Sequence, residues 1–216
     1  MAIRLRWRWA LSFVLVLGLL AAVPAVRRGT LRQLGRALVA SDPVERADLA
    51  VLMTAVGAVG ELEVADLVHE GRAGRVLVMV PPPSRIEGEY ARRGVSLETP
   101  GTRSVRILGA LGVPIGAIDV LEVAQGGTVG ELAALRQWCA EHRVGSVIVV
   151  SDRPHSRRAR RTLRRAMADT PVGFFVNPPR FDRFDVADWW SDRDSLRAGI
   201  IELEKLALDW ILHPLS

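Results

Sequence analysis

The chain has 216 residues and a formal net charge of +5, with 49% hydrophobic and 25% charged residues. This composition is close to that of folded globular domains, so it excludes a disordered chain and a protein with many membrane spans. The length allows one domain of ordinary size plus an appendage. Cys139 is the only cysteine, which excludes an intrachain disulfide, and the four histidines have no metal-ligand spacing, so no metal site is predicted.

Residues 10–26 are uncharged and almost wholly apolar, and arginines stand on both sides of them. Such a segment predicts one N-terminal transmembrane helix. We therefore divide the chain into a membrane anchor with a juxtamembrane segment at 1–40 and an α/β domain at 41–216. A cleaved signal peptide is the alternative, since Val23, Pro24 and Ala25 supply a cleavage site.

Both interpretations place the domain outside the cytoplasm when the N-terminus stays inside. The arginines before and after the segment nearly balance, so charge alone does not settle the orientation. Leu31, Leu34 and Leu38 share one face of a predicted helix, which would either continue the anchor or lie on the membrane surface.

From Asp48 onward, short β-branched runs alternate with amphipathic segments. We predict strands at 49–56, 76–80, 117–123, 146–151 and 172–176. Helices are predicted at 61–70, 103–111, 128–142 and 156–168. The alternation predicts a Rossmann-like, doubly wound, mostly parallel sheet of about five strands. The runs 76–80 and 147–150 are continuously apolar, as in central strands buried on both faces.

A final helix from Asp194 would dock on the domain through one apolar side. That side is predicted to carry Leu196, Ile200, Leu203, Leu206 or Ala207, and Trp210.

Ligands of such sheets bind beyond the carboxyl ends of the strands. After the third strand, Gly126, Gly127 and Thr128 would present free N–H groups to an anion at a helix N-terminus. Thr128 and Glu131 also have the spacing of a capping box, and the two roles are compatible. We name the two glycines and Thr128 as ligand-binding candidates and Glu131 as a candidate catalytic residue.

The fourth strand is followed by Ser151, Asp152, His155 and Arg158. His155 and Arg158 are three positions apart at a helix start, so they would supply a proton donor and a clamp for phosphate or carboxylate. We predict His155 as catalytic and Ser151, Asp152 and Arg158 as ligand-binding. Asp152 would hold His155 or cap the helix. The alternative is a surface histidine beside a solvated arginine.

The arginine-rich run at 156–165 predicts an amphipathic helix with a solvated outer face. No stacking aromatic residues are interleaved, so no nucleic-acid partner is expected, whereas anionic lipid headgroups would suit a helix that faces the membrane. Cys139 lies on an apolar helix face with Leu132 and Leu135, which predicts a packed thiol.

Several weak motifs, taken in order, resemble the YdcF-like family of bacterial envelope proteins, which includes the SanA and ElyC types. They are an Ala-Asp-hydrophobic first strand at 47–51, a helix leading into the strand at 71–78, and a Leu-Gly-Val-Pro turn at 111–114. Thr128 with Glu131, Ser151 with His155, Arg158 and Ala159, and the pair Trp189-Trp190 complete the pattern over about residues 46–213.

The resemblance implies a Rossmann-like fold, an anchor in the bacterial inner membrane with the domain outside the cytoplasm, and a role in envelope or peptidoglycan-precursor homeostasis. The polar residues clustered after the strands favour an anionic small molecule or a lipid-linked precursor such as a polyprenyl phosphate as the ligand, and no cofactor is identified. Two glycine turns of the family are altered here, to Gly57 and Gly60 after the first strand and to Pro81, Pro82 and Pro83 after the second. A non-catalytic interaction module with a lapsed ligand site is therefore the alternative.

Overall fold

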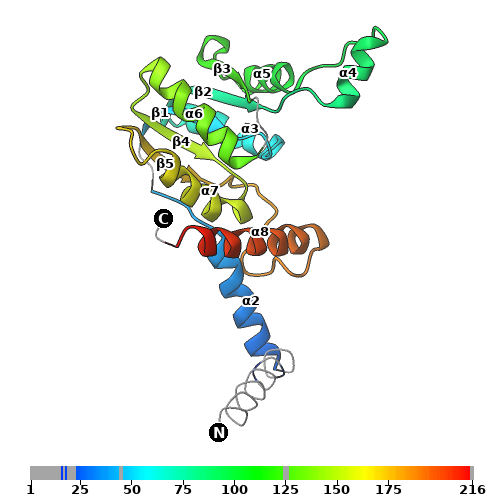
Figure 1. Ribbon diagram of the computed structural model, residues 1–216, viewed down its shortest axis with the longest axis vertical. Helices are drawn as coiled ribbons and strands as arrows, with labels where there is room; N and C mark the ends of the chain where they lie inside the picture. Colours follow the sequence, from blue (N-terminus) through cyan, green and yellow to red (C-terminus); the bar gives the residue numbers. More distant parts are fainter. Residues whose placement is uncertain (1–15, 17, 19–22, 44–45, 124–126, 215–216) are drawn as a thin grey trace.

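The computed structural model describes residues 16, 18, 23–43, 46–123 and 127–214. It confirms an α/β, Rossmann-like fold with one five-stranded sheet in the order β3-β2-β1-β4-β5 (Figure 1). All four neighbouring strand pairs are parallel. The strands are β1 (Ala47–Leu52), β2 (Ala73–Val80), β3 (Ile118–Glu122), β4 (Ser146–Val150) and β5 (Gly173–Asn177).

Helices cover both faces of the sheet (Figure 1). α3 (Ala58–His69) and α5 (Pro100–Ala110) pack together on one face, and α6 (Thr128–His142) and α7 (Arg153–Ala166) pack together on the other. The chain runs outward from β1 to β3 and then returns to β4 on the other side of β1. This reversal is the point at which open α/β sheets bind their ligands.

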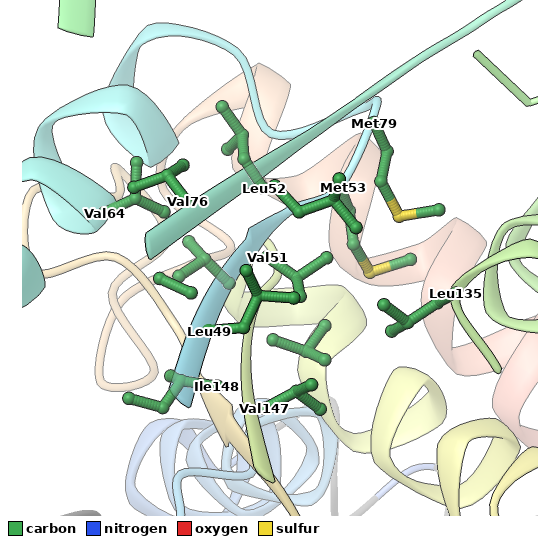
Figure 2. Close-up of a cluster of buried hydrophobic side chains, with 14 of the residues drawn as sticks. Leu49, Val51, Leu52, Met53, Val64, Val76, Met79, Leu135, Val147 and Ile148 are labelled. Atoms are coloured by element: carbon green, nitrogen blue, oxygen red, sulfur yellow. The ribbon is translucent and has the colours of Figure 1, made fainter. Parts of the chain in front are cut away.

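The core lies between the sheet and its helices (Figure 2). Val76 and Leu77 of β2 and Val147 and Ile148 of β4 are fully buried, which confirms the prediction of central strands covered on both faces. Cys139 is also buried, as predicted, and burial raises the pKa of its thiol to about 11.

Two boundaries differ from the sequence prediction. β1 ends at Leu52 rather than at 56, because the chain turns there: the Val56 N–H donates to the Met53 carbonyl, and Gly57 takes a φ of +63° before α3 begins. α4 (Arg85–Arg92) was not predicted. It has no buried residue and is too short to show a long apolar stripe, and a capping box between Ser84 and Glu87 begins it. A short 3-10 turn, η1 (Ile115–Ala117), leads into β3.

A second core cluster joins α2 (Pro24–Leu38) to α8 (Arg193–Leu212). Trp189 is its centre, with 2% of its surface exposed, and its indole Nε1 donates to the Leu31 carbonyl at 2.8 Å. Leu38 is buried against the same cluster, while Leu34 is exposed. The C-terminal half of α2 therefore packs with the domain, although the sequence prediction assigns it to the juxtamembrane segment.

The predicted transmembrane segment at 10–26 lies largely outside the described residues. Within the part of the chain that is described, no helix combines the length and the hydropathy needed to cross a membrane.

The predicted docking side of α8 is partly wrong. Its buried positions are Ser195, Gly199, Glu202 and Leu206, whereas Ile200 and Trp210 are about half exposed. Leu196, Leu203 and Leu206 do face the second core, as predicted, but Gly199 and the ion-paired Glu202 share that side, and Ile200 lies outside it.

Candidate functional site

The reversal of the chain brings the ends of β1 and β4 together. Thr54 follows β1, and Ser151 and Asp152 follow β4. Ser151 is 1% exposed, and its hydroxyl has no hydrogen-bond partner among the described residues. A buried hydroxyl of this kind is a polar group available to a ligand, because buried polar atoms are nearly always paired.

The N-terminus of α6 faces this region. Gly127 is the N-cap residue, with a φ of +90° that favours glycine, and Thr128 is the first helical residue. The predicted capping box is therefore wrong, because Thr128 lies one position too far along for its hydroxyl to bond the amide of Glu131, which donates to the Gly127 carbonyl instead. The candidate Gly126 lies outside the described residues.

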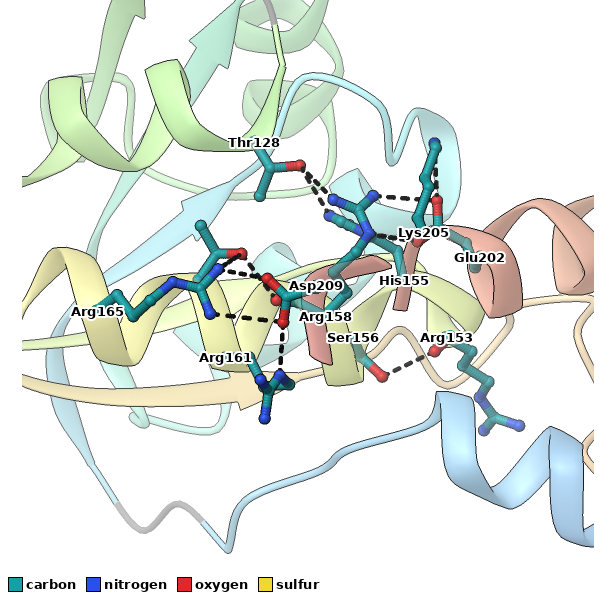
Figure 3. Close-up of polar contacts among 11 residues, drawn as sticks. Thr128, Arg153, His155, Ser156, Arg158, Arg161, Arg165, Glu202, Lys205 and Asp209 are labelled. Carbon is teal, nitrogen blue, oxygen red and sulfur yellow. Dashed lines mark hydrogen bonds and ion pairs between the residues drawn. The ribbon is translucent and has the colours of Figure 1, made fainter. Parts of the chain in front are cut away.

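The Thr128 hydroxyl is the meeting point of two side chains of α7 (Figure 3). Its Oγ1 lies 3.3 Å from Nε2 of His155 and accepts from Nη1 of Arg158 at 3.4 Å. The structure thus brings together three of the predicted site residues from two helices. The first amides of α6 have no partner within the helix, so positive potential and hydrogen-bond donors converge at this point.

Glu202 of α8 binds both His155 and Arg158 (Figure 3). Its carboxylate lies 3.1 Å from Nδ1 of His155 and accepts from Nε and Nη2 of Arg158 at 2.8 and 3.1 Å. Lys205 donates to the same carboxylate at 3.0 Å. The two-point contact with Arg158 fixes the plane of the guanidinium group.

The electrostatics of the cluster favour an anion. Burial alone would raise the pKa of the Glu202 carboxyl, but the hydrogen bonds from His155 and Arg158 outweigh burial and hold that pKa far below its ordinary value. Glu202 is therefore ionised, and its single negative charge faces two permanent positive charges, those of Arg158 and Lys205. The N-terminus of α6 adds a further favourable potential for an anion, while the Asp152 carboxylate nearby opposes it at neutral pH.

Asp152 neither caps α7 nor holds His155, and its predicted role in ligand binding stays a prediction. It stands at the N-cap position of α7, but its side chain makes no capping bond, and Asp182 accepts from the Arg153 N–H at 2.7 Å instead. Nδ1 of His155 is bound by Glu202. Burial, with repulsion from Asp182 and Glu202, raises the pKa of Asp152 to about 6.

Glu131 contacts the turn after β1. It is 5% exposed and accepts a hydrogen bond from the hydroxyl of Thr54. The contact ties the first turn of α6 to the turn after β1. The candidate catalytic role of Glu131 stays a prediction.

Two hollows lie along the carboxyl ends of β1, β2 and β3. A cavity of about 280 Å³ is lined by Thr54, Gly57, Glu61 and neighbouring residues. A larger groove of about 810 Å³ continues between α4 and α5, and the two share Val80 and Pro81. Pro81, Pro82 and Pro83 offer no N–H, and Glu87, Glu98 and Glu122 also line the groove. This end of the crevice is therefore mostly apolar and is not an anion cradle.

The arginines of α7 are not a solvated face, and that prediction is wrong. Arg161 is only 5% exposed, and both Arg161 and Arg165 bind Asp209 of α8, at 2.5 and 2.6 Å. Arg158 and Arg165 are seven positions apart on α7, and their partners Glu202 and Asp209 are seven positions apart on α8. The arginines of one helix therefore pair with the carboxylates of the other at the same spacing. Arg164, in the last turn of α7, is exposed.

Sequence reasoning misses Glu202, the residue on which the cluster depends. The signal is present but indirect: two acidic residues of α8 repeat the spacing of the arginines of α7. Nothing in either helix alone shows that the two will pack together.

No model of a known protein family matches the chain, and no curated protein matches it. The YdcF-like resemblance therefore rests on the order of its motifs.

Proposed function

We propose that the chain is a membrane-anchored, YdcF-like protein of the bacterial envelope that binds an anionic small molecule or a lipid-linked precursor. One observation carries the proposal: Thr128, at the N-terminus of α6, lies within hydrogen-bonding distance of both His155 and Arg158. Helix N-termini bind phosphate and carboxylate groups through free amides, and arginine adds a charge-assisted contact.

A phosphate at this point would accept from the first amides of α6 and from Nη1 of Arg158. His155 supplies proton transfer. When its Nδ1–H donates to Glu202, its Nε2 carries a lone pair directed at Thr128, and this nitrogen can take a proton from a hydroxyl of the ligand. The arrangement therefore supports anion binding more directly than it supports general-base catalysis.

The apolar groove supports a ligand with a hydrocarbon part. It continues from the cavity at Thr54, which is tied to α6 through Glu131. A lipid-linked precursor would place its charged group at Thr128 and its chain along Pro81 and Val80. Ligand pockets of this size are mostly apolar with a few polar groups that orient the ligand.

The proposed location is the inner membrane, with a single pass formed by the apolar segment at 10–26 and the domain outside the cytoplasm. The motif order described above supports this location.

A non-catalytic interaction module is the second candidate. Two observations favour it: the proline turn after β2, and the full occupation of the Glu202 carboxylate by Arg158, His155 and Lys205, which would also make a stable structural cluster.

Binding by the full chain in detergent distinguishes the two. We expect farnesyl phosphate to bind more tightly than inorganic phosphate and farnesol to bind weakly, measured by calorimetry. Arg158→Gln should weaken farnesyl phosphate binding about tenfold or more, because a charge-assisted hydrogen bond is worth about 1.5–3 kcal/mol and 1.4 kcal/mol is a factor of about ten.

Arg92→Gln is the matched control, since Arg92 is an exposed arginine on α4 and should leave affinity unchanged. Thermal unfolding of both variants checks that the fold is retained. If none of the three compounds binds, or if Arg158→Gln binds as well as the unchanged chain, the interaction module is the better account.

A further inference from the structure

Residues 81–99 connect β2 to α5, and none of them is buried. We call this segment, which contains α4, the arm. Four large apolar side chains of the arm are well exposed: Ile86 at 70%, Leu97 at 45%, and Tyr90 and Val95 at 44% each. Connections of this length without packing of their own are uncommon in compact domains, and they usually act as lids or binding loops. The arm is therefore a candidate for a lid.

α4 lacks the support that a helix of its length needs. It has eight residues, and it has no substantial packing against another described helix or strand. Figure 1 shows it standing apart from the sheet. Helices shorter than about 12–15 residues are marginal in water, so α4 is held only by its capping box and by the exposed ion pairs of Arg92 and Arg93 with Glu89. A segment with so few buried contacts opens and reforms easily.

Both ends of the arm are fixed to the domain. The three prolines at 81–83 have restricted φ angles, which stiffen the exit from β2. At the other end, Arg106 of α5 donates from Nε and Nη2 to Glu98 at 2.9 and 3.1 Å. Within the described chain, residues 84–97 form hydrogen bonds and ion pairs only among themselves. Motion of the arm is therefore confined to residues 84–97.

The arm stands beside the proposed ligand site. Glu87 of α4 and Glu98 line both the cavity near Thr54 and the groove between α4 and α5. Val95 and Leu97 also line the groove, and each is nearly half exposed. A hydrocarbon chain in the groove would cover their exposed surface. The ligand would thus supply the apolar contacts that the arm lacks.

We propose that the arm is a lid: residues 84–97 open and reform in the ligand-free chain and close against α5 when a hydrocarbon chain occupies the groove. This inference rests on the proposed function, because the lipid-linked ligand triggers the closure, but the mobility of α4 without ligand does not depend on it. The lid would exclude water from the crevice, as closing loops of binding sites do. An anion without a hydrocarbon chain would bind and leave the lid open.

Hydrogen exchange followed by mass spectrometry tests the ligand-free state. The full chain is placed in lipid nanodiscs, which keep free detergent out of the groove. α5 is the internal control, because it is a helix of 11 residues with a fully buried Leu108. We expect the amides of α4 to be protected less than about tenfold relative to an unstructured peptide, and those of α5 about a hundredfold more than those of α4. Equal protection of the two helices would show that the arm is fixed and would overturn the lid.

The same measurement with ligands tests closure. Farnesyl phosphate should slow exchange in α4 about tenfold or more, because binding stabilises the closed arm. Inorganic phosphate has no hydrocarbon chain and should leave that exchange unchanged.

Leu97→Asn should weaken farnesyl phosphate binding about three- to tenfold, since covering the exposed half of a leucine contributes about half of the value for a whole side chain. Ile211→Asn is the matched control, because Ile211 is 73% exposed on α8, outside the arm. Both positions are exposed, so both variants should keep the thermal midpoint of the unchanged chain.

Calorimetry on the same samples, with empty nanodiscs as the reference, separates the results that would overturn the proposal. Farnesyl phosphate that binds without slowing exchange in α4 would refute the lid and leave the ligand site standing. Absence of binding would overturn the ligand site and the lid together. Slow exchange in α4 that depends on protein concentration and not on ligand would show that a second copy of the chain covers the arm, which also refutes the lid.

Discussion

Glu202 shows how much one buried carboxylate determines in this chain. It binds His155, Arg158 and Lys205 at once, and its side chain is only 11% exposed. Removing one partner of a buried ion pair leaves the others without compensation, which costs more than the pair itself contributes.

We predict that Glu202→Gln lowers the free energy of unfolding by about 3 kcal/mol at pH 7. The pKa of Glu202 is depressed in the folded state, so its contribution is complete above the ordinary value of 4.5 and is lost as the pH falls below that value. The difference between the variant and the unchanged chain should therefore shrink in acid. Urea unfolding between pH 3 and 7 measures it.

Glu204→Gln is the control, because Glu204 is exposed on the same helix. Equal stability of the two variants at neutral pH would show that the Glu202 cluster does not stabilise the fold.

Between elements, close approach matters more than helix propensity. α2 and α8 meet around Trp189 through two glycines: a Cβ on Gly35 would lie 2.8 Å from Trp189 Cδ1 and 2.8 Å from the Val186 carbonyl, and a Cβ on Gly199 would lie 2.5 Å from the same indole. Neither backbone nor a buried ring can move aside cheaply.

Gly35→Ala should therefore destabilise the protein by about 1–3 kcal/mol, because overpacking outweighs the gain in helix propensity. Gly29→Ala, in the same helix with open space around it, should instead stabilise by about 0.5–1 kcal/mol. Thermal unfolding of the two variants compares them directly. Opposite signs are expected, and a stabilising Gly35→Ala would mean that α2 does not pack on Trp189.

For the whole molecule, the packing of α2 on the domain fixes the helix that follows the apolar segment relative to the site. The arginines around the apolar segment balance, so orientation has to be measured. We predict that alkaline phosphatase fused after Ser216 is active in bacterial cells, because that enzyme works only outside the cytoplasm. The same fusion without residues 1–23 should be inactive. Fluorescence from a cytoplasmic reporter at the same position would contradict the proposed topology.

The strands of the sheet can be predicted from short segments of the sequence. Runs such as 76–80 and 147–150 are apolar at every position, and alternation with helices implies parallel strands, since a parallel connection needs a crossover. The positions of Thr128, His155 and Arg158 near one crevice follow from the same rule, because the residues after parallel strands share one edge of the sheet.

Local sequence patterns do not show which residues of distant helices the charged and small residues will contact. The sequence predicts Arg161 on a solvated face, but α8 brings Asp209 against it. The sequence predicts Ile200 as buried, but the ion pairs turn that face of α8 outward. Periodicity reports how apolar residues are spaced along one helix. Which side of the helix is buried depends on the charges and glycines of the helix it meets, and only the folded chain places the two together.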